Sequence, residues 1–234
     1  MHITKITKEL QKIGRPCSKA ERDFVLRYLG TSKKFLCVKA PDRDKLLREV
    51  LKETKDLSAE KLLKILDELF CSGVHDYINF AGKFLTKSKT AREAVSLARI
   101  EKWVAKTQGW AECDIICQSL FSEKEVLERW NNWQKAIRKF SKSKNIQLRR
   151  ASLVLQVRPN GKSNDPRLRA LAIEIIEKLK SEKSVLVTKA ISWLLRALQN
   201  ENKVEIKKYL QANKSTLPPI AYRETMRKIE TAKK

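Results

Sequence analysis

Apolar residues recur along most of the chain at intervals of three and four, the spacing of amphipathic helices. Two clear runs are Leu46, Leu47, Val50, Leu51 and Leu62, Leu63, Leu66, Leu69. Several polar pairs have the spacing of a capping box, in which a hydroxyl and a carboxylate bind the first free backbone amides of a helix. These pairs are Ser18 with Glu21, Thr90 with Glu93, and Ser122 with Glu125. The pattern predicts about a dozen helices and no strand.

The predicted helix starts are almost evenly spaced. They fall near positions 18, 42, 58, 74, 90, 108, 122, 146, 165, 184, 202 and 218, with Asp165-Pro166 and Pro218-Pro219 opening two of them. Helix pairs therefore repeat every roughly 32 to 40 residues, near the lower edge of the HEAT and armadillo range. We expect residues 1–234 to form a single all-α domain, a curved α-solenoid of HEAT-like antiparallel helix pairs with a concave face.

Composition adds a strong charge to this picture. The chain has 234 residues with 51 Lys and Arg against 27 Asp and Glu, a formal net charge of +24 spread from Lys5 to Lys234. Such a surface attracts polyanions, so DNA, RNA or an anionic membrane surface would suit it. Six glycines and six prolines are too few for a turn-dense β-fold. No apolar run is long enough to cross a membrane and the first residues lack a secretory signal, so we expect a cytoplasmic protein.

The cysteines and histidines give little sign of a disulfide or metal site. There are five cysteines, Cys17, Cys37, Cys71, Cys113 and Cys117, and two histidines, His2 and His75. An odd cysteine count without a signal peptide favours reduced thiols, so we expect no disulfide. Too few partners accompany Cys113 and Cys117 for a four-ligand zinc site, and no metal is expected.

The helix predicted over 184–198 carries an aromatic residue outside its apolar face. That face comprises Val187, Ala190, Ile191, Leu194, Leu195 and Leu198. Lys189 and Arg196 lie almost opposite it, and Trp193 falls on the same polar side. An indole among cations suits stacking on a ligand next to phosphate-binding charges. The alternative is a tryptophan whose edge packs on the neighbouring repeat.

The helix predicted near Gly109 places Trp110, Asp114 and Cys117 on one face. A carboxylate beside an aromatic ring in a partly desolvated site would stabilise a developing cation. The alternative is an ordinary acidic residue near a helix N-terminus.

Two basic pairs are candidates for phosphate contacts. Arg149 and Arg150 belong to an inner helix predicted over 146–157, and Lys33 and Lys34 belong to a loop predicted within 28–42. Guanidinium groups bind phosphate bidentately, and lysines beside aromatic rings suit a nucleic-acid backbone. Solvated surface arginines and a basic loop that caps the first repeat are the alternatives.

Four blocks together resemble the DNA alkylation repair family, the AlkD-like HEAT-repeat DNA glycosylases. The blocks are Tyr28 to Asp42, Trp110 to Leu120, Leu148 to Gln156, and Thr188 to Arg196. The resemblance implies a monomer whose concave basic face grips duplex DNA, and excision of cationic N3- and N7-alkylpurines in base excision repair. It implies hydrolysis of the N-glycosidic bond with no cofactor.

Carried over by position, Trp193, Arg196 and Arg150 match a second cage tryptophan and two backbone-binding arginines of the family. The family's Trp-Asp-x-x-Asp block has two possible registers in this chain. An ungapped alignment puts its tryptophan and catalytic aspartate on Cys113 and Cys117, whereas the other register pairs Trp110 with Asp114. The first register would leave a noncatalytic DNA or branched-DNA binder. A solenoid scaffold for an acidic partner is a further alternative.

Overall fold

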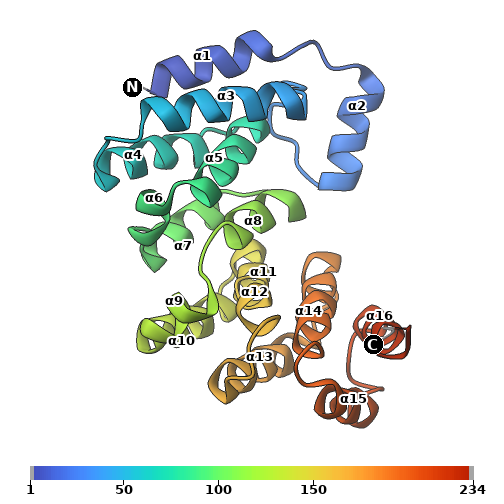
Figure 1. Cartoon of the computed structure of the whole chain (residues 1–234). Helices are drawn as coiled ribbons and strands as arrows, with labels where there is room; N and C mark the ends of the chain where they lie inside the picture. The colour runs from blue at the N-terminus through green and yellow to red at the C-terminus, as the bar shows by residue number, and fades with distance from the viewer. Residues whose placement is uncertain (1–2, 232–234) are drawn as a thin grey trace. The chain divides into compact units, whose positions relative to one another are not determined.

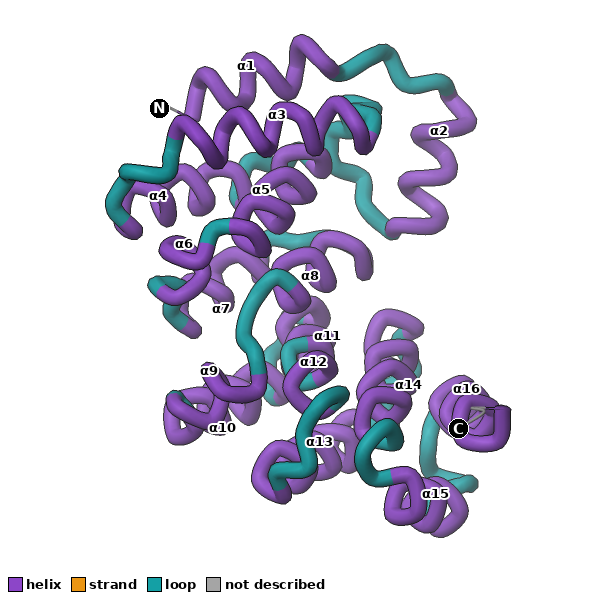
Figure 2. Tube along the Cα trace, in the orientation of Figure 1, coloured by secondary structure: helices purple, strands orange, loops and turns teal. Residues whose placement is uncertain are grey.

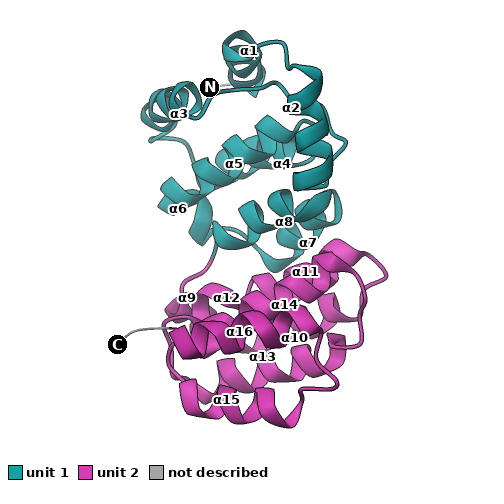
Figure 3. Ribbon diagram, turned by 90° about the vertical axis from the view of Figure 1, so that its right-hand side faces the viewer, with its two compact units in different colours: residues 1–120 teal, residues 121–234 magenta. Residues whose placement is uncertain are grey.

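The computed structural model describes residues 3–231, and the regular structure in this range is helical (Figures 1 and 2). It consists of sixteen α-helices and one π-helix, with no β-strand in the described range beyond an isolated bridge between Lys34 and Val74. The all-α prediction is therefore confirmed. The chain divides into two compact units, residues 1–120 and residues 121–234 (Figure 3). The single-domain assignment stays a prediction.

Unit 1 is built from eight α-helices and the π-helix. They are α1 (Ile3–Ile13), α2 (Lys19–Phe24), η1 (Val25–Leu29), α3 (Ala40–Glu53), α4 (Ala59–Phe70), α5 (His75–Lys87), α6 (Lys89–Glu93), α7 (Leu97–Ala105) and α8 (Gly109–Gln118). Helix α5 lies at the centre and packs against α3, α4 and α8. The apolar run predicted at Leu62, Leu63, Leu66 and Leu69 is buried in α4. The unit therefore buries the helix faces that the sequence pattern predicts.

Unit 2 contains the remaining helices. They are α9 (Glu123–Glu128), α10 (Trp130–Ser141), α11 (Ile146–Val154), α12 (Val157–Asn160), α13 (Pro166–Leu179), α14 (Val185–Leu198), α15 (Lys203–Ala212) and α16 (Pro219–Thr231). Helices α10, α13 and α15 pair with α11, α14 and α16, and α14 packs between α11 and α16. The six apolar residues predicted for the packing face of α14 are all buried. This is the stacking of HEAT-like helix pairs.

The predicted helix starts lie close to observed helix starts, and several of the predicted caps form. Ser18 and Ser122 form complete capping boxes with Glu21 and Glu125, and Asp165 caps α13 with Pro166 following it. The prediction at Thr90 is wrong, because the hydroxyl of Ser88 caps this helix by accepting a hydrogen bond from Ala91 N. The region then breaks into α6 and α7, which is one reason why the structure has more helices than predicted.

The loop predicted within 28–42 is shorter than expected. Helix α2 continues directly into η1, which ends at Gly30 in a left-handed conformation (φ 73°), and α3 begins at Ala40. Between them the chain is not helical and lies beside the start of α5, where His75 N donates to Lys34 O at 2.9 Å. The α2–η1 segment runs crosswise to α1 and α3 (Figure 1).

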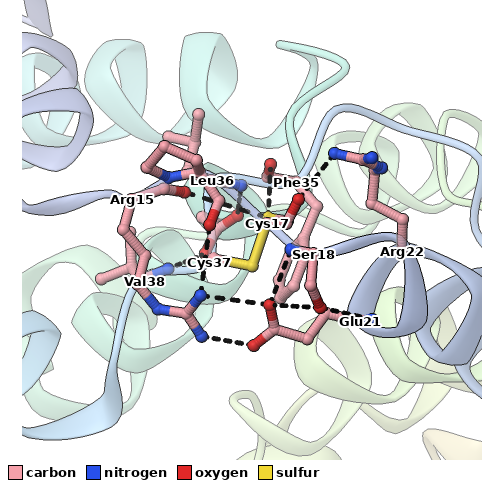
Figure 4. Close-up of a disulfide and its surroundings, with 11 residues drawn as sticks. Arg15, Cys17, Ser18, Glu21, Arg22, Phe35, Leu36, Cys37 and Val38 are labelled. Carbon is pink, nitrogen blue, oxygen red and sulfur yellow. Dashed lines mark hydrogen bonds and ion pairs between the residues drawn. A yellow bond between two sulfur atoms is a disulfide. The ribbon is translucent and has the colours of Figure 1, made fainter.

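The expectation of no disulfide is wrong, because Cys17 and Cys37 are joined (Figure 4). An odd cysteine count excludes pairing of all five, but not of two. The fold brings these two together: Arg15 N donates to Leu36 O at 3.0 Å, and the two Cα atoms are 5.7 Å apart. The disulfide closes the loop that contains α2 and η1.

Between residues 3 and 231 the structure has neither a helix suited to span a membrane nor a cluster suited to hold a metal ion. No helix between residues 3 and 231 has both the length and the apolar character needed to cross a membrane. No group of three or more His, Cys, Asp or Glu side chains in that range is arranged to hold a metal ion. His2 lies outside the described residues.

Candidate functional site

The candidate residues of helix α8 differ in how deeply they are buried. Cys113 and Cys117 are buried in unit 1, with their Sγ atoms 3.9 Å apart. Trp110 and Asp114 stay partly exposed and follow each other by one helical turn. Of the two registers of the catalytic block, one therefore places its side chains in the core and the other places them within reach of solvent.

Two glycines allow the end of η1 to pack closely against the start of α8. Gly109 has a left-handed backbone (φ 65°), and a Cβ atom built on it would lie 1.9 Å from Leu29 O. A Cβ on Gly30 would lie 3.1 Å from Gly109 Cα. Side chains at these positions would force the two segments apart. The contact lets Trp110 Nε1 donate a hydrogen bond to Tyr28 O at 2.6 Å.

A buried ionic cluster adjoins this contact between η1 and α8. Glu112 of α8 is completely buried and pairs with Lys33 Nζ at 2.8 Å and with His75 Nδ1 at 3.1 Å. Thr31 Oγ1 and Gln108 N also donate to the Glu112 carboxylate, each at 2.8 Å. The cluster ties the segment after η1 and the start of α5 to the first turn of α8, so it fixes the helix that carries Trp110 and Asp114.

The Glu112 carboxylate stays charged despite its burial. Burial alone would raise its pKa, but hydrogen bonds from His75, Lys33 and Gln108 N outweigh this effect and hold the pKa below the ordinary value. Lys33 Nζ also donates a hydrogen bond to Lys106 O at 2.7 Å. Its ammonium joins two segments of unit 1, whereas Lys34 is exposed. Phosphate contacts by either lysine stay a prediction.

Three aromatic rings contact one another in series between α2 and α8. Phe24 and Tyr28 stack with their ring centroids 5.1 Å apart, and Tyr28 meets Trp110 edge-on at 5.5 Å. Of these three residues, Trp110 is a candidate from the sequence pattern and Phe24 is not. A signal was present, since Phe24 lies between Arg22 and Arg27 in a segment with no amphipathic pattern to bury it.

In unit 2, α14 carries Trp193, Lys189 and Arg196 on the side away from its buried face. Trp193 is half-buried and Lys189 is exposed. Arg196 is ion-paired with Glu224 of α16, and Ser192 Oγ also donates to that carboxylate at 2.6 Å. Burial would raise the pKa of Glu224, but the Ser192 hydrogen bond and the Arg196 charge outweigh it and lower the pKa.

The paired arginines of α11 have different surroundings. Arg149 is partly exposed and forms an ion pair with Glu182 at 2.6 Å. Arg150 is buried and donates to the carbonyl of Leu186 in α14. Both guanidinium groups therefore help to hold unit 2 together, and their phosphate contacts stay a prediction.

The predicted site residues divide between the two units. Trp110, Asp114, Lys33 and Lys34 belong to unit 1, and Arg149, Arg150, Lys189, Trp193 and Arg196 belong to unit 2. Sequence reasoning did not find Glu112, His75 or Glu224, whose roles depend on partners at least 28 residues away along the chain.

Comparison with known proteins gives a family match and shows similarity to solved structures. A family model described as "DNA alkylation repair enzyme" matches residues 6–229. A structure described as a predicted DNA alkylation repair enzyme from Enterococcus faecalis superposes with a TM-score of 0.74 at 20% sequence identity, covering 94% of this chain and 100% of that chain. No curated protein matches the sequence.

A second structure belongs to a family described as related to the HEAT-like repeat DNA glycosylases, with affinity for branched DNA structures. It superposes with a TM-score of 0.67 at 14% identity, covering 98% of this chain and 94% of that chain. At such identities the likeness shows the fold, and it confirms the HEAT-like prediction.

Proposed function

The chain belongs to the DNA alkylation repair enzyme family, and from that premise we propose that it is a DNA glycosylase for cationic N3- and N7-alkylated purines in duplex DNA. The observation that carries this proposal is the difference in burial among the candidate residues of α8. Trp110 and Asp114 are partly exposed, whereas Cys113 and Cys117 are buried. A catalytic tryptophan and aspartate must reach the substrate, so the exposure of these side chains supports the register that pairs Trp110 with Asp114.

The chemistry needs only modest help from the protein. In the reaction the bond between the purine N9 and the sugar C1′ breaks, and its electron pair leaves with the purine. The cationic base becomes neutral, while positive charge develops on the sugar until water adds to C1′ and loses a proton. A carboxylate at Asp114 and the ring face of Trp110 would stabilise that developing charge. Alkylation has already made the base a good leaving group, so no cofactor is required.

Residues of unit 2 complete the proposal. Trp193 would present a ring to the DNA, and Lys189, Arg149 and Arg196 would contact the DNA backbone, with Lys34 of unit 1. Backbone contacts by Arg150, which is buried, and by Lys33, which is paired with Glu112, would require their present partners to be exchanged for phosphate. The net charge of +24 supports a polyanionic partner of this kind. A monomer is part of this proposal, and the cytoplasmic location expected from the sequence stays a prediction.

The experiment compares base release by three proteins. Purified wild type, Asp114→Asn and Asp56→Asn are incubated with methylated duplex DNA, and the released bases are separated by chromatography. Asp56 is an exposed aspartate of the same unit, in the turn after α3, and serves as the matched control. We expect Asp114→Asn to lower the rate of 7-methylguanine release at least about a hundredfold, the scale of losing one electrostatic catalyst. Unchanged release would remove Asp114 from the mechanism.

A second candidate is a DNA binder without catalysis. The ungapped register favours it, because it puts Cys117 where the family has its catalytic aspartate. This candidate predicts salt-dependent DNA binding by wild type with no base release. Base release that depends on Asp114 would exclude it.

A further inference from the structure

The α2–η1 segment exposes an unusual amount of apolar surface. Among the described residues, the large hydrophobic side chains classed as exposed are Phe24, Leu26, Tyr28, Val185 and Val204. Three of these five lie within five consecutive positions, with 53% of Phe24, 54% of Leu26 and 58% of Tyr28 accessible to solvent. Single exposed hydrophobic residues are ordinary on protein surfaces, but such a cluster indicates an interaction surface.

The two rings of this cluster are already arranged for stacking. Phe24 and Tyr28 lie one turn apart with an interplanar angle of 20°. Tyr28 in turn meets Trp110 at 87°, so the stacked pair ends at the proposed catalytic tryptophan. We call Phe24 and Tyr28 the aromatic step.

The surrounding chain holds the aromatic step in place. The Cys17–Cys37 disulfide closes the loop around α2 and η1, and the hydrogen bond from Trp110 to Tyr28 O fixes its far end. At its start, Arg15 Nη1 donates to Glu21 Oε2 at 3.1 Å, which ties the first turn of α2 to the chain before it (Figure 4). A surface fixed in this way loses little conformational entropy when it binds a ligand.

The charge around the step suits a polyanion. From residue 15 to residue 39 the chain has seven Lys and Arg and only two Asp and Glu. Lys19, Arg22 and Arg27 are exposed on the same short segment as the rings. Aromatic faces among cations are what single-stranded nucleic acid requires, because bases stack on the rings while phosphates pair with the cations.

We propose that the aromatic step of Phe24 and Tyr28 stacks an unpaired nucleobase next to Trp110, so that the protein binds DNA with an unpaired base more tightly than intact duplex. An intact duplex covers both faces of every internal base, whereas an unpaired base leaves a face free for an aromatic ring. This inference rests on the DNA-binding part of the proposed function and does not depend on catalysis.

The test measures binding of undamaged DNA. Two duplexes of equal length are compared, one fully paired and one with a single unpaired 2-aminopurine. The proteins are wild type, the double variant Phe24→Ala/Tyr28→Ala, and Leu26→Ala. Leu26 is the matched control, because it is equally exposed in the same segment but has no ring. The mutated side chains are more than half exposed, so the fold should persist, and circular dichroism with thermal unfolding verifies it.

We expect wild type to prefer the DNA with the unpaired base and to quench the 2-aminopurine fluorescence on binding. The double variant should lose about tenfold in affinity for that DNA, the scale of one base–ring stack, and change less than twofold for intact duplex. Leu26→Ala should behave as wild type. Equal binding of both DNAs by wild type, or an equal loss with Leu26→Ala, would overturn the inference. Binding of the same proteins to phosphatidylserine vesicles is measured in parallel. If the double variant kept its DNA binding but lost its binding to the vesicles, the inference would be overturned in favour of a membrane surface.

The same variants separate this inference from the proposed function. Asp114→Asn should keep the preference for the unpaired base, because Asp114 acts on the glycosidic bond and not on the stacked base. If no protein releases methylated bases but the preference depends on Phe24 and Tyr28, the stacking surface stands without the glycosylase. If base release depends on Asp114 but no preference is found, only the stacking surface fails.

Discussion

Glu112 is a completely buried acid whose carboxylate joins Lys33, His75 and Thr31 to the first turn of α8. Removing its charge would leave the Lys33 ammonium buried without its partner, and breaking a buried pair in this way costs about 3–5 kcal/mol. We predict a loss of this size in the free energy of unfolding for Glu112→Gln at pH 7, measured by urea denaturation.

The loss in the free energy of unfolding caused by Glu112→Gln should disappear in acid. The folded-state pKa of Glu112 lies below its ordinary value. Its stabilising contribution is therefore complete above the pKa of the unfolded chain, about 4.3, and vanishes as the pH falls through the lower folded-state pKa. Asp76 acts in the opposite direction, since burial raises its pKa, but it is present in both proteins. A difference between wild type and Glu112→Gln that did not shrink between pH 7 and pH 3 would contradict this account.

A substitution at Gly109 tests how far the close contact between η1 and α8 constrains the fold. Gly109→Ala has two costs, a left-handed backbone and a Cβ atom that meets Leu29 O. Gly73 is the matched control, because it also has a positive φ (74°) but open space around its Cα atom. We expect Gly73→Ala to cost about 1–2 kcal/mol, the penalty for a left-handed residue, and Gly109→Ala to cost at least twice as much in urea denaturation. Equal costs would show that the close approach does not constrain the fold.

At the scale of elements, the α2–η1 segment is held by the Cys17–Cys37 disulfide. The two cysteines are 20 positions apart, and closing a loop of this size stabilises a fold by about 3 kcal/mol. We predict that dithiothreitol lowers the thermal midpoint of wild type. Cys17→Ser/Cys37→Ser should unfold at the reduced midpoint with or without dithiothreitol. A wild-type midpoint that ignored dithiothreitol would mean that the disulfide contributes no stability.

How far the sequence predicts these elements depends on the range of the interactions. The buried face of α14 and the caps at Ser18, Ser122 and Asp165 depend on neighbours within a few positions, so the pattern found them. The π-helix after Phe24 and the break between α6 and α7 leave no periodic signal. The disulfide was missed because it requires two distant segments to lie side by side.

The same limit applies to the candidate site. The spacing of Trp110 and Asp114 is local, and their shared exposure on α8 could be anticipated. The ion pairs of Lys33 with Glu112 and of Arg196 with Glu224 could not, because their partners come from other helices. Basic residues chosen from sequence therefore include both exposed cations, such as Lys189, and cations that hold helices together.

At the scale of the whole molecule, the net charge of +24 predicts DNA binding that weakens steeply with salt. A protein that makes about six phosphate contacts loses about a thousandfold in affinity between 50 and 200 mM salt. We expect a loss of this order for undamaged duplex in fluorescence anisotropy titrations. Lys189→Ala, which removes an exposed cation of α14, should reduce the slope of log affinity against log salt by about one. Binding insensitive to salt would contradict an electrostatic interface.

The most direct test of the central claim is the single-turnover release of bases from duplexes that each contain one defined lesion. One duplex contains cationic 7-methylguanine and the other contains neutral hypoxanthine, at protein concentrations that saturate both. A site that only stabilises charge at the sugar, through Asp114 and Trp110, should release 7-methylguanine and leave hypoxanthine in place. Tight binding without release of 7-methylguanine, or equal release of the two bases, would contradict the account.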